Sequence, residues 1–173
     1  SMAMDSAKIE ADGLKPIQPL LDKVNAITDV KSLVNTVSDL KKIGSNTLFS
    51  DYVYQDAKKS DAMSYNLSQG GLGLPEREYY FKTDSATINI RNEYVKYITQ
   101  ILTMAGEDAT VAATAAKNIL ALETKLATAS RKIEDLRDPY KNYNKMAITD
   151  LGKMAGNIDW VSYLKNTGVQ KVD

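Results

Sequence analysis

The chain has 173 residues, of which 43% are hydrophobic and 25% charged, and it contains no cysteine and no histidine. This composition is typical of one globular domain, and it excludes disulfides, cysteine nucleophiles, histidine bases and thiolate or imidazole metal ligands. The 22 basic and 22 acidic side chains balance. Because no basic stripe faces a phosphate backbone, general nucleic-acid binding is not expected.

The sequence shows neither a signal peptide nor a segment long enough to span a membrane. No apolar run approaches the ~20 residues that span a bilayer, and the N-terminus lacks the apolar stretch of a signal peptide. We interpret residues 1–3 as a cloning remnant and residues 4–173 as natural sequence. On that interpretation any targeting signal has been removed, and its absence says nothing about compartment.

The first 45 residues predict three helices. A short helix is expected over 5–11 and a second after Pro16, since proline fits a first helical turn. Asp29 can cap the third helix, whose apolar residues recur every three or four positions and form one stripe. Gly44 supplies its left-handed stop.

After the third helix, the spacing of the hydrophobic residues changes from helical to alternating. Residues 48–55 are aromatic and β-branched, and residues 62–69 alternate, with Met63, Tyr65 and Leu67 on one face. With the polar stretch 56–61 between them, they predict a β-hairpin over about 48–69. An isolated hairpin is marginally stable in water, so this one is expected to pack on helices or on another part of a larger protein.

Two longer helices are predicted over 85–105 and 108–130, and their short link makes them antiparallel neighbours. Their expected inward residues are Ile90, Tyr94, Tyr97, Ile98, Ile101 and Leu102, then Val111, Ala115, Ile119, Leu122 and Leu126. Short helices follow over 149–154, capped by Thr149, and over 158–164. The predicted fold class is mainly α, with orthogonal or antiparallel packing of several helices and one hairpin.

The glycine run at 70–75 invites comparison with a phosphate-binding loop. No Gly-Lys-Ser/Thr follows it, and Glu76 stands where a dinucleotide motif needs glycine. We interpret the run as a tight structural turn whose glycines let the backbone pass close to a neighbour.

The sequence gives only weak signals for other catalytic or binding residues. The carboxylate pairs are Glu76 with Glu78, Glu107 with Asp108, and Glu134 with Asp135. Neighbours on a helix point to different faces, so capping and solvation explain these pairs better than acid–base catalysis. The tyrosines at 79, 80, 94 and 97 suit either a pocket or a core. Ser60 with Lys58 or Lys59 is formally a nucleophile pair, and Asn66-Leu67-Ser68 matches a glycosylation sequon.

Three stretches, in this order, resemble one family. The first reads QGGLGLPEREYY over 69–80, the second joins Arg137-Asp138-Pro139 to Tyr143-Asn144-Lys145-Met146, and the third is 160–164. Together they are similar to the N-terminal, non-catalytic region of the neprilysin and endothelin-converting-enzyme family of zinc metallopeptidases. The resemblance covers nearly the whole chain. Vertebrate members are rich in cysteine and have a membrane anchor, so a cysteine-free chain indicates a bacterial member.

The resemblance implies two mainly helical domains around a cavity. One carries zinc on an H-E-x-x-H motif and a downstream glutamate, and the other caps the cavity and admits only short peptides. Residues 4–173 match part of the capping domain, so no catalytic, cofactor-binding or metal residue carries over to this chain. Arg77, Arg137 and Trp160 match family motifs and are interpreted as structural, as buried arginines that bridge loops and a packed tryptophan.

We therefore expect a non-catalytic, size-sieving segment of a zinc-dependent endopeptidase in a bacterial periplasm or cell envelope. The parent would bind zinc and the segment none. Its partners would be the catalytic domain of the same polypeptide and short peptides, without nucleic acid or membrane contact. Exposed apolar surface is expected where that domain docks. The alternatives are a free-standing helical protein- or peptide-binding module, and an independent hydrolase using Ser–Lys or paired carboxylates.

Overall fold

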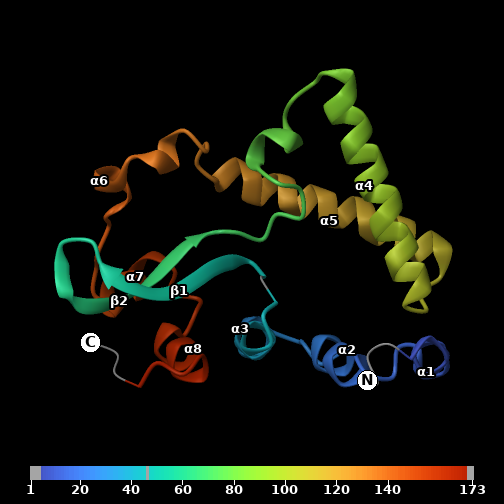
Figure 1. Cartoon of the computed structure of the whole chain (residues 1–173), viewed down its shortest axis with the longest axis horizontal. Coiled ribbons are helices and arrows are strands. Elements are labelled where there is room, and N and C mark those ends of the chain that lie inside the picture. Colours follow the sequence, from blue (N-terminus) through green and yellow to red (C-terminus); the bar gives the residue numbers. More distant parts are fainter. Residues whose placement is uncertain (1–4, 46, 171–173) are drawn as a thin grey trace. The chain divides into compact units, whose positions relative to one another are not determined.

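The computed structural model describes residues 5–45 and 47–170, which form a mainly α-helical chain with one β-hairpin (Figure 1). This confirms the predicted fold class. The chain divides into two compact units: unit 1 combines residues 1–45 with 145–173, and unit 2 spans 46–144. Residues 1–3, interpreted above as a cloning remnant, lie outside the described residues.

Unit 1 is built from helices at both ends of the chain. They are α1 (Ser6–Asp12), α2 (Gln18–Asn25), α3 (Val30–Lys42), α7 (Ile148–Met154) and α8 (Trp160–Asn166). Helix α3 packs against α2 and α8, and α7 packs against α8. The buried apolar side chains of this unit are Val34, Val37, Trp160, Tyr163 and Leu164.

The helix boundaries of unit 1 follow local signals in most places. Asp29 caps α3, accepting the backbone N–H of Ser32 at 2.7 Å in a reciprocal capping box, and Gly44 follows with φ +86°. The predicted cap at Thr149 is wrong. Helix α7 begins at Ile148, after Ala147 in an extended conformation, so Thr149 already lies inside the first turn.

Unit 2 begins with the hairpin, in which β1 (Phe49–Asp56) pairs antiparallel with β2 (Lys59–Gln69). The connection is only residues 57–58, shorter than the predicted 56–61. The Asp56 carboxylate accepts the backbone N–H of Lys58 at 2.9 Å, which closes a tight side-chain turn. Met63 and Leu67 share a face as predicted, but both are exposed.

The rest of unit 2 is helical. A 3₁₀ turn at Arg77–Tyr80 leads to α4 (Ser85–Met104) and α5 (Ala109–Ala129), which pack on each other across a short link (Figure 1). A second 3₁₀ turn at Asp135–Arg137 precedes α6 (Pro139–Asn142). Helix α5 turns its alanines inward, with Ala112, Ala116 and Ala127 fully buried.

Five predicted inward positions of α4 and α5 are exposed instead: Ile90, Tyr97, Ile101, Val111 and Leu122. Both helices carry apolar residues on more than one face, so periodicity alone does not select the face that packs. The alanine face of α5 is chosen because small side chains permit close approach of a neighbouring element. These five bulky side chains remain on the surface, whereas the predicted inward residues Tyr94, Ile98, Leu102, Ile119 and Leu126 are half-buried.

Candidate functional site

In unit 2, a pocket of about 490 Å³ lies beside the glycine run. Its wall includes the loop from Gln69 to Glu78, Glu123 of α5, and the segment 130–133 that follows α5. These are the residues of the first family-like motif together with parts of the chain that it contacts. The geometry of this loop therefore shows what the motif does.

The first two glycines of the loop pass directly against the start of the hairpin. A Cβ on Gly70 would lie 2.9 Å from the backbone nitrogen of Ser50, and one on Gly71 would lie 2.8 Å from the carbonyl oxygen of Leu48. Gly71 also has φ +76°, where side chains are strained. These contacts confirm that the glycines let the backbone pass close to a neighbour, whereas residues 70–76 form an irregular, bent loop without a hydrogen-bonded turn.

Beneath the loop, a buried carboxylate joins three elements. Glu123 of α5 accepts hydrogen bonds from the Tyr80 hydroxyl at 2.7 Å and the Tyr94 hydroxyl at 2.9 Å. The Tyr80 oxygen in turn accepts the backbone N–H of Leu74 at 3.0 Å. A Cβ on Gly73 would lie 1.8 Å from the Tyr94 oxygen, so only glycine leaves room for this phenol. The network fixes the loop to both long helices.

Burial, together with the hydrogen bond to Glu123, raises the pKa of both tyrosine hydroxyls. The pKa of Tyr80 rises from 10.0 to about 12, although the N–H of Leu74 opposes the rise, and the pKa of Tyr94 rises for the same two reasons. A phenol whose pKa is raised on folding stabilises the folded state below its unfolded pKa. That stability is lost as the pH rises through the pKa that the phenol has in the folded state.

Alkaline titration is therefore expected to destabilise unit 2 as the pH rises from 10 to about 12, with Tyr80 and Tyr94 ionising as the unit unfolds. Tyrosinate absorbance, followed together with circular dichroism, measures both events. In a Tyr80→Phe variant the late ionisation should shrink. Titration of all ten tyrosines as one population on an intact fold would contradict the assignment.

Arg77 bridges the loop to the end of α5. Its Nε donates to the carbonyl of Ala127 at 3.2 Å, and its guanidinium pairs with Glu78 at 2.6 Å and lies over the Phe81 ring. Nearby, the Gln69 side chain exchanges two hydrogen bonds with the backbone of Arg131, at 2.9 and 3.1 Å. The bridging role predicted for Arg77 is confirmed, but its side chain is half-buried and not buried as predicted.

The second motif holds the tip of the hairpin. Asp138 caps α6, with Pro139 in its first turn, and the Tyr143 hydroxyl donates to the buried Asp56 carboxylate at 3.0 Å. The Lys58 ammonium lies 4.3 Å from the centre of the Tyr143 ring. Arg137 is exposed, so the prediction that it is a buried bridging arginine is wrong, because the 3₁₀ turn that carries it faces solvent.

The third motif lies in the core of unit 1. Trp160 is buried, donates from its indole nitrogen to the carbonyl of Ala155 at 3.3 Å, and meets the Tyr163 ring edge to face. This confirms a packed tryptophan.

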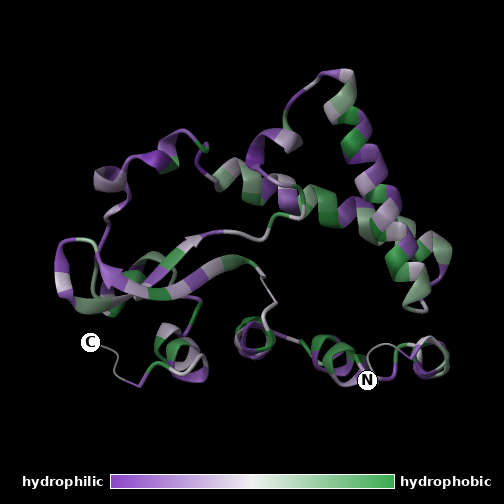
Figure 2. Ribbon diagram, in the orientation of Figure 1, coloured by the Kyte–Doolittle hydropathy of each residue, from purple (hydrophilic) through white to green (hydrophobic). Residues whose placement is uncertain are grey.

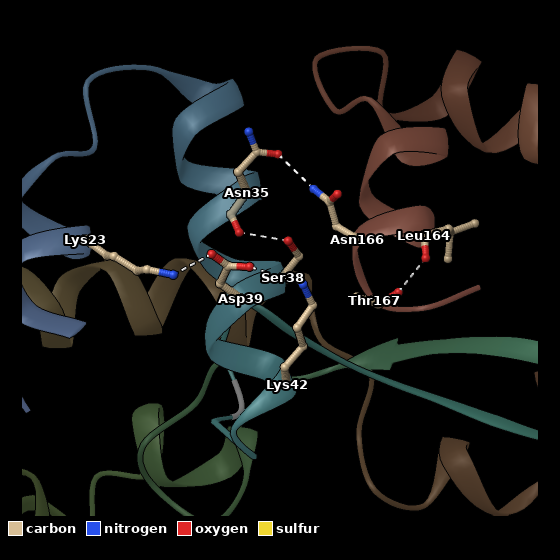
Figure 3. A network of polar contacts seen from close by, with 8 residues as sticks. All are labelled: Lys23, Asn35, Ser38, Asp39, Lys42, Leu164, Asn166 and Thr167. Atoms are coloured by element: carbon tan, nitrogen blue, oxygen red, sulfur yellow. Dashed lines mark hydrogen bonds and ion pairs between the residues drawn. The ribbon is translucent and has the colours of Figure 1, made fainter. Parts of the chain in front are cut away.

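A polar network lies beside that core (Figure 3). Asn166 of α8 donates to the Asn35 side chain at 3.2 Å, and Asp39 bridges Lys23 at 2.7 Å and Lys42 at 3.3 Å. Hydrogen bonds from Lys23 and then Lys42 hold the pKa of Asp39 below its usual value. A shallow pocket of about 350 Å³ lies between α3 and α8. The ion pair of Lys23 with Asp39 and the hydrogen bond of Asn166 with Asn35 tie α2, α3 and α8 together.

Comparison with known proteins decides what these motifs belong to. The model of "Peptidase family M13", for its N-terminal region, matches residues 1–173. The chain belongs to peptidase family M13. This M13 chain is 28% identical to neprilysin-3 of Drosophila melanogaster, over 91% of the chain and 21% of that protein. It is 31% identical to endothelin-converting enzyme 1 of Bos taurus, over 93% of the chain and 22% of that protein.

Comparison with solved structures gives a similar result. The M13 chain superposes on zinc metalloprotease 1 of Mycobacterium tuberculosis in complex with an inhibitor with a TM-score of 0.89 and 28% identity. On the open state of the same protein the TM-score is 0.88, also at 28% identity. Both matches cover 95% of this chain and 25% of the other. The chain therefore spans about a fifth to a quarter of the length of its relatives.

The candidate catalytic groups of the M13 chain have structural partners or face solvent. Asp108 caps α5, Glu78 pairs with Arg77, and Lys58 lies over Tyr143. Glu134 and Asp135 are exposed, as is Ser60. Of the four tyrosines, Tyr80 and Tyr94 converge on Glu123 while Tyr97 is exposed. The structure thus brings no predicted nucleophile and base together among its described residues.

Glu123 is the residue that sequence reasoning missed. It lies beside Leu122, which the pattern assigned to the core, and its burial depends on tyrosines 29 and 43 positions away. The available signal was that Glu123 is the single acidic residue of α5, whose other charged residues are Lys117 and Lys125. A buried carboxylate requires hydrogen-bond donors, and the tyrosines of the loop and α4 were the candidates.

Proposed function

We propose that this chain is the non-catalytic part of a zinc-dependent endopeptidase that caps the internal cavity and restricts entry to short peptides. The observation that carries the proposal is the match of the whole chain to the N-terminal region of family M13, together with its similarity to a zinc metalloprotease. Peptide hydrolysis would then belong to the remainder of the full-length polypeptide, and that remainder would be the partner of this segment.

The residues of this chain do not fit a zinc site. The sequence has no histidine or cysteine, and residues 5–45 and 47–170 bring no three potential metal ligands together. The motif residues instead hold a loop, a hairpin tip and a helical core in place. Such roles suit a wall that must keep its shape while a substrate enters.

For its cellular place, we propose the periplasm or envelope of a bacterium, since this cysteine-free chain is similar to a mycobacterial protease. In the described part of the chain, none of the helices combines the length and apolar character needed to cross a bilayer. Fractionation of cells that produce the full-length protein would test this location.

The activity is tested on the full-length protein with a series of peptides of increasing length. Chelator-sensitive cleavage is expected for short peptides, with kcat/KM falling as the peptide lengthens. A Gly73→Ala variant, which displaces Tyr94 from the loop, is expected to raise the ratio of long-peptide to short-peptide cleavage. Gly152→Ala is the matched control, since a Cβ there meets open space.

Three results would count against the proposal. A parent that cleaves long and short peptides equally well would remove the sieving role. A parent that binds peptides without cleaving them would favour the free-standing binding module. Peptidase activity or stoichiometric tight zinc binding by the 173-residue chain alone would show that the chemistry lies here.

A further inference from the structure

The pocket of about 350 Å³ between α3 and α8 lies within unit 1 and combines apolar with polar walls. Helix α3 contributes Val30 and Val34, one turn apart on the same side of the helix. Asn35 of α3 and Asn166 of α8 also line the pocket, and Figure 3 shows their amides meeting between the two helices. Figure 2 shows hydrophobic and hydrophilic residues side by side in both helices. The pocket therefore offers a ligand both an apolar surface and hydrogen-bonding groups.

The amides of this pocket keep hydrogen-bonding capacity that the protein does not use. Asn166 donates to the side-chain oxygen of Asn35 at 3.2 Å, which leaves the oxygen of Asn166 and the amino group of Asn35 for a ligand. Asn157 and Lys31 line the same pocket, and their side chains have no hydrogen-bond partner among residues 5–45 and 47–170. A bound molecule would thus meet groups that donate and groups that accept.

The charges that line the pocket balance. Lys31 carries one positive charge and Asp159 one negative charge, and the other lining residues are neutral. Hydrogen bonds from Ser162, and to a smaller extent the charge of Lys31, hold the pKa of Asp159 below its usual value. Both carboxylate oxygens of Asp159 already accept hydrogen bonds from Ser162, at 3.0 and 2.7 Å. The pocket therefore favours a neutral ligand over an anion or a cation.

We propose that this α3–α8 pocket binds one or two units of a neutral sugar. Each sugar hydroxyl both donates and accepts hydrogen bonds, which suits side-chain amides, and the C–H face of a sugar ring is apolar, which suits Val30 and Val34. The volume lies at the lower end of the range for small-ligand sites. A peptide is the less favoured occupant, because the residues that line the pocket provide no sheet edge, no aromatic ring and no excess of positive charge.

The probe is N-acetylglucosamine, titrated into the full-length protein and followed by saturation-transfer NMR. A dissociation constant on the order of 1 mM is expected for a ligand of about 15 heavy atoms. Asn157→Ala removes an amide without breaking a contact within the described residues, and it is expected to weaken binding about fivefold. Asn25→Ala is the matched control, since Asn25 is exposed at the end of α2 and does not line the pocket. It is expected to leave the affinity unchanged.

No saturable binding at about tenfold the expected dissociation constant would overturn the inference. Binding that Asn157→Ala leaves unchanged would place the sugar elsewhere and would also overturn it. Tighter binding of N-acetyl-trialanine amide than of the sugar would assign the pocket to peptides instead. If Asn157→Ala does not fold, Lys31→Met removes a different exposed donor from the same pocket. Sugar affinity does not depend on peptide cleavage, so failure of the proposed function is distinguishable from failure of this inference.

Discussion

Replacing Gly71 with alanine is expected to lower the free energy of unfolding of the chain by about 3–4 kcal/mol. Two costs combine at this position. The left-handed φ of +76° disfavours a side chain, and the added Cβ would lie 2.8 Å from the carbonyl oxygen of Leu48. Because that neighbour is backbone, relief requires the loop to move away from the start of the hairpin. Denaturant unfolding followed by circular dichroism measures the change.

Two further glycines separate these costs. Gly106 has φ +102° but open space where an added Cβ would lie, so Gly106→Ala isolates the backbone strain, at about 1–2 kcal/mol. Gly152 lies inside α7 with open space around it and no left-handed φ, so Gly152→Ala is expected to stabilise the chain by about 0.5–1 kcal/mol. If Gly71→Ala costs no more than Gly106→Ala, the close contact with Leu48 contributes nothing.

Replacing Glu123 with alanine is expected to cost about 3–4 kcal/mol. The substitution leaves the hydroxyls of Tyr80 and Tyr94 without their acceptor in a buried setting and opens space between α5 and the loop. Glu123→Gln retains the shape and one acceptor oxygen, so about 1–2 kcal/mol is expected. The free energy of unfolding of unit 2 is the quantity to compare.

Glu107→Ala is the matched control for Glu123, because Glu107 is exposed between the two long helices. Its effect is expected to stay within about 0.5 kcal/mol. Equal losses at 107 and 123 would mean that the buried network does not stabilise the fold.

Local signals accounted for much of the fold. The caps at Asp29 and Asp108 and the stop at Gly44 depend on residues within one or two turns of the helix end, so the sequence shows them directly. The glycine run also indicated a close backbone approach, although the residues it approaches, Leu48 and Ser50, lie about 20 positions away.

The features that the sequence did not predict depend on contacts between residues far apart in the chain. The choice between the two apolar faces of α5 is made by what packs against it, and the hydrogen bond from Tyr143 to Asp56 joins residues 87 positions apart. The burial of Glu123 and the exposure of Tyr97 are likewise set by residues distant in the sequence. Family resemblance identified the motifs correctly, but only the structure shows that Arg77 holds a loop while Arg137 faces solvent.

The division of the chain into units has a consequence for its synthesis. Unit 2 is one continuous segment, 46–144, whereas unit 1 needs residues 1–45 and 145–173 together. During translation the hairpin and the long helix pair can therefore fold first, while α3 waits for α8 to emerge from the ribosome. A nascent chain that stalls before Trp160 would present the apolar side of α3 to chaperones and proteases, although its central unit is already native.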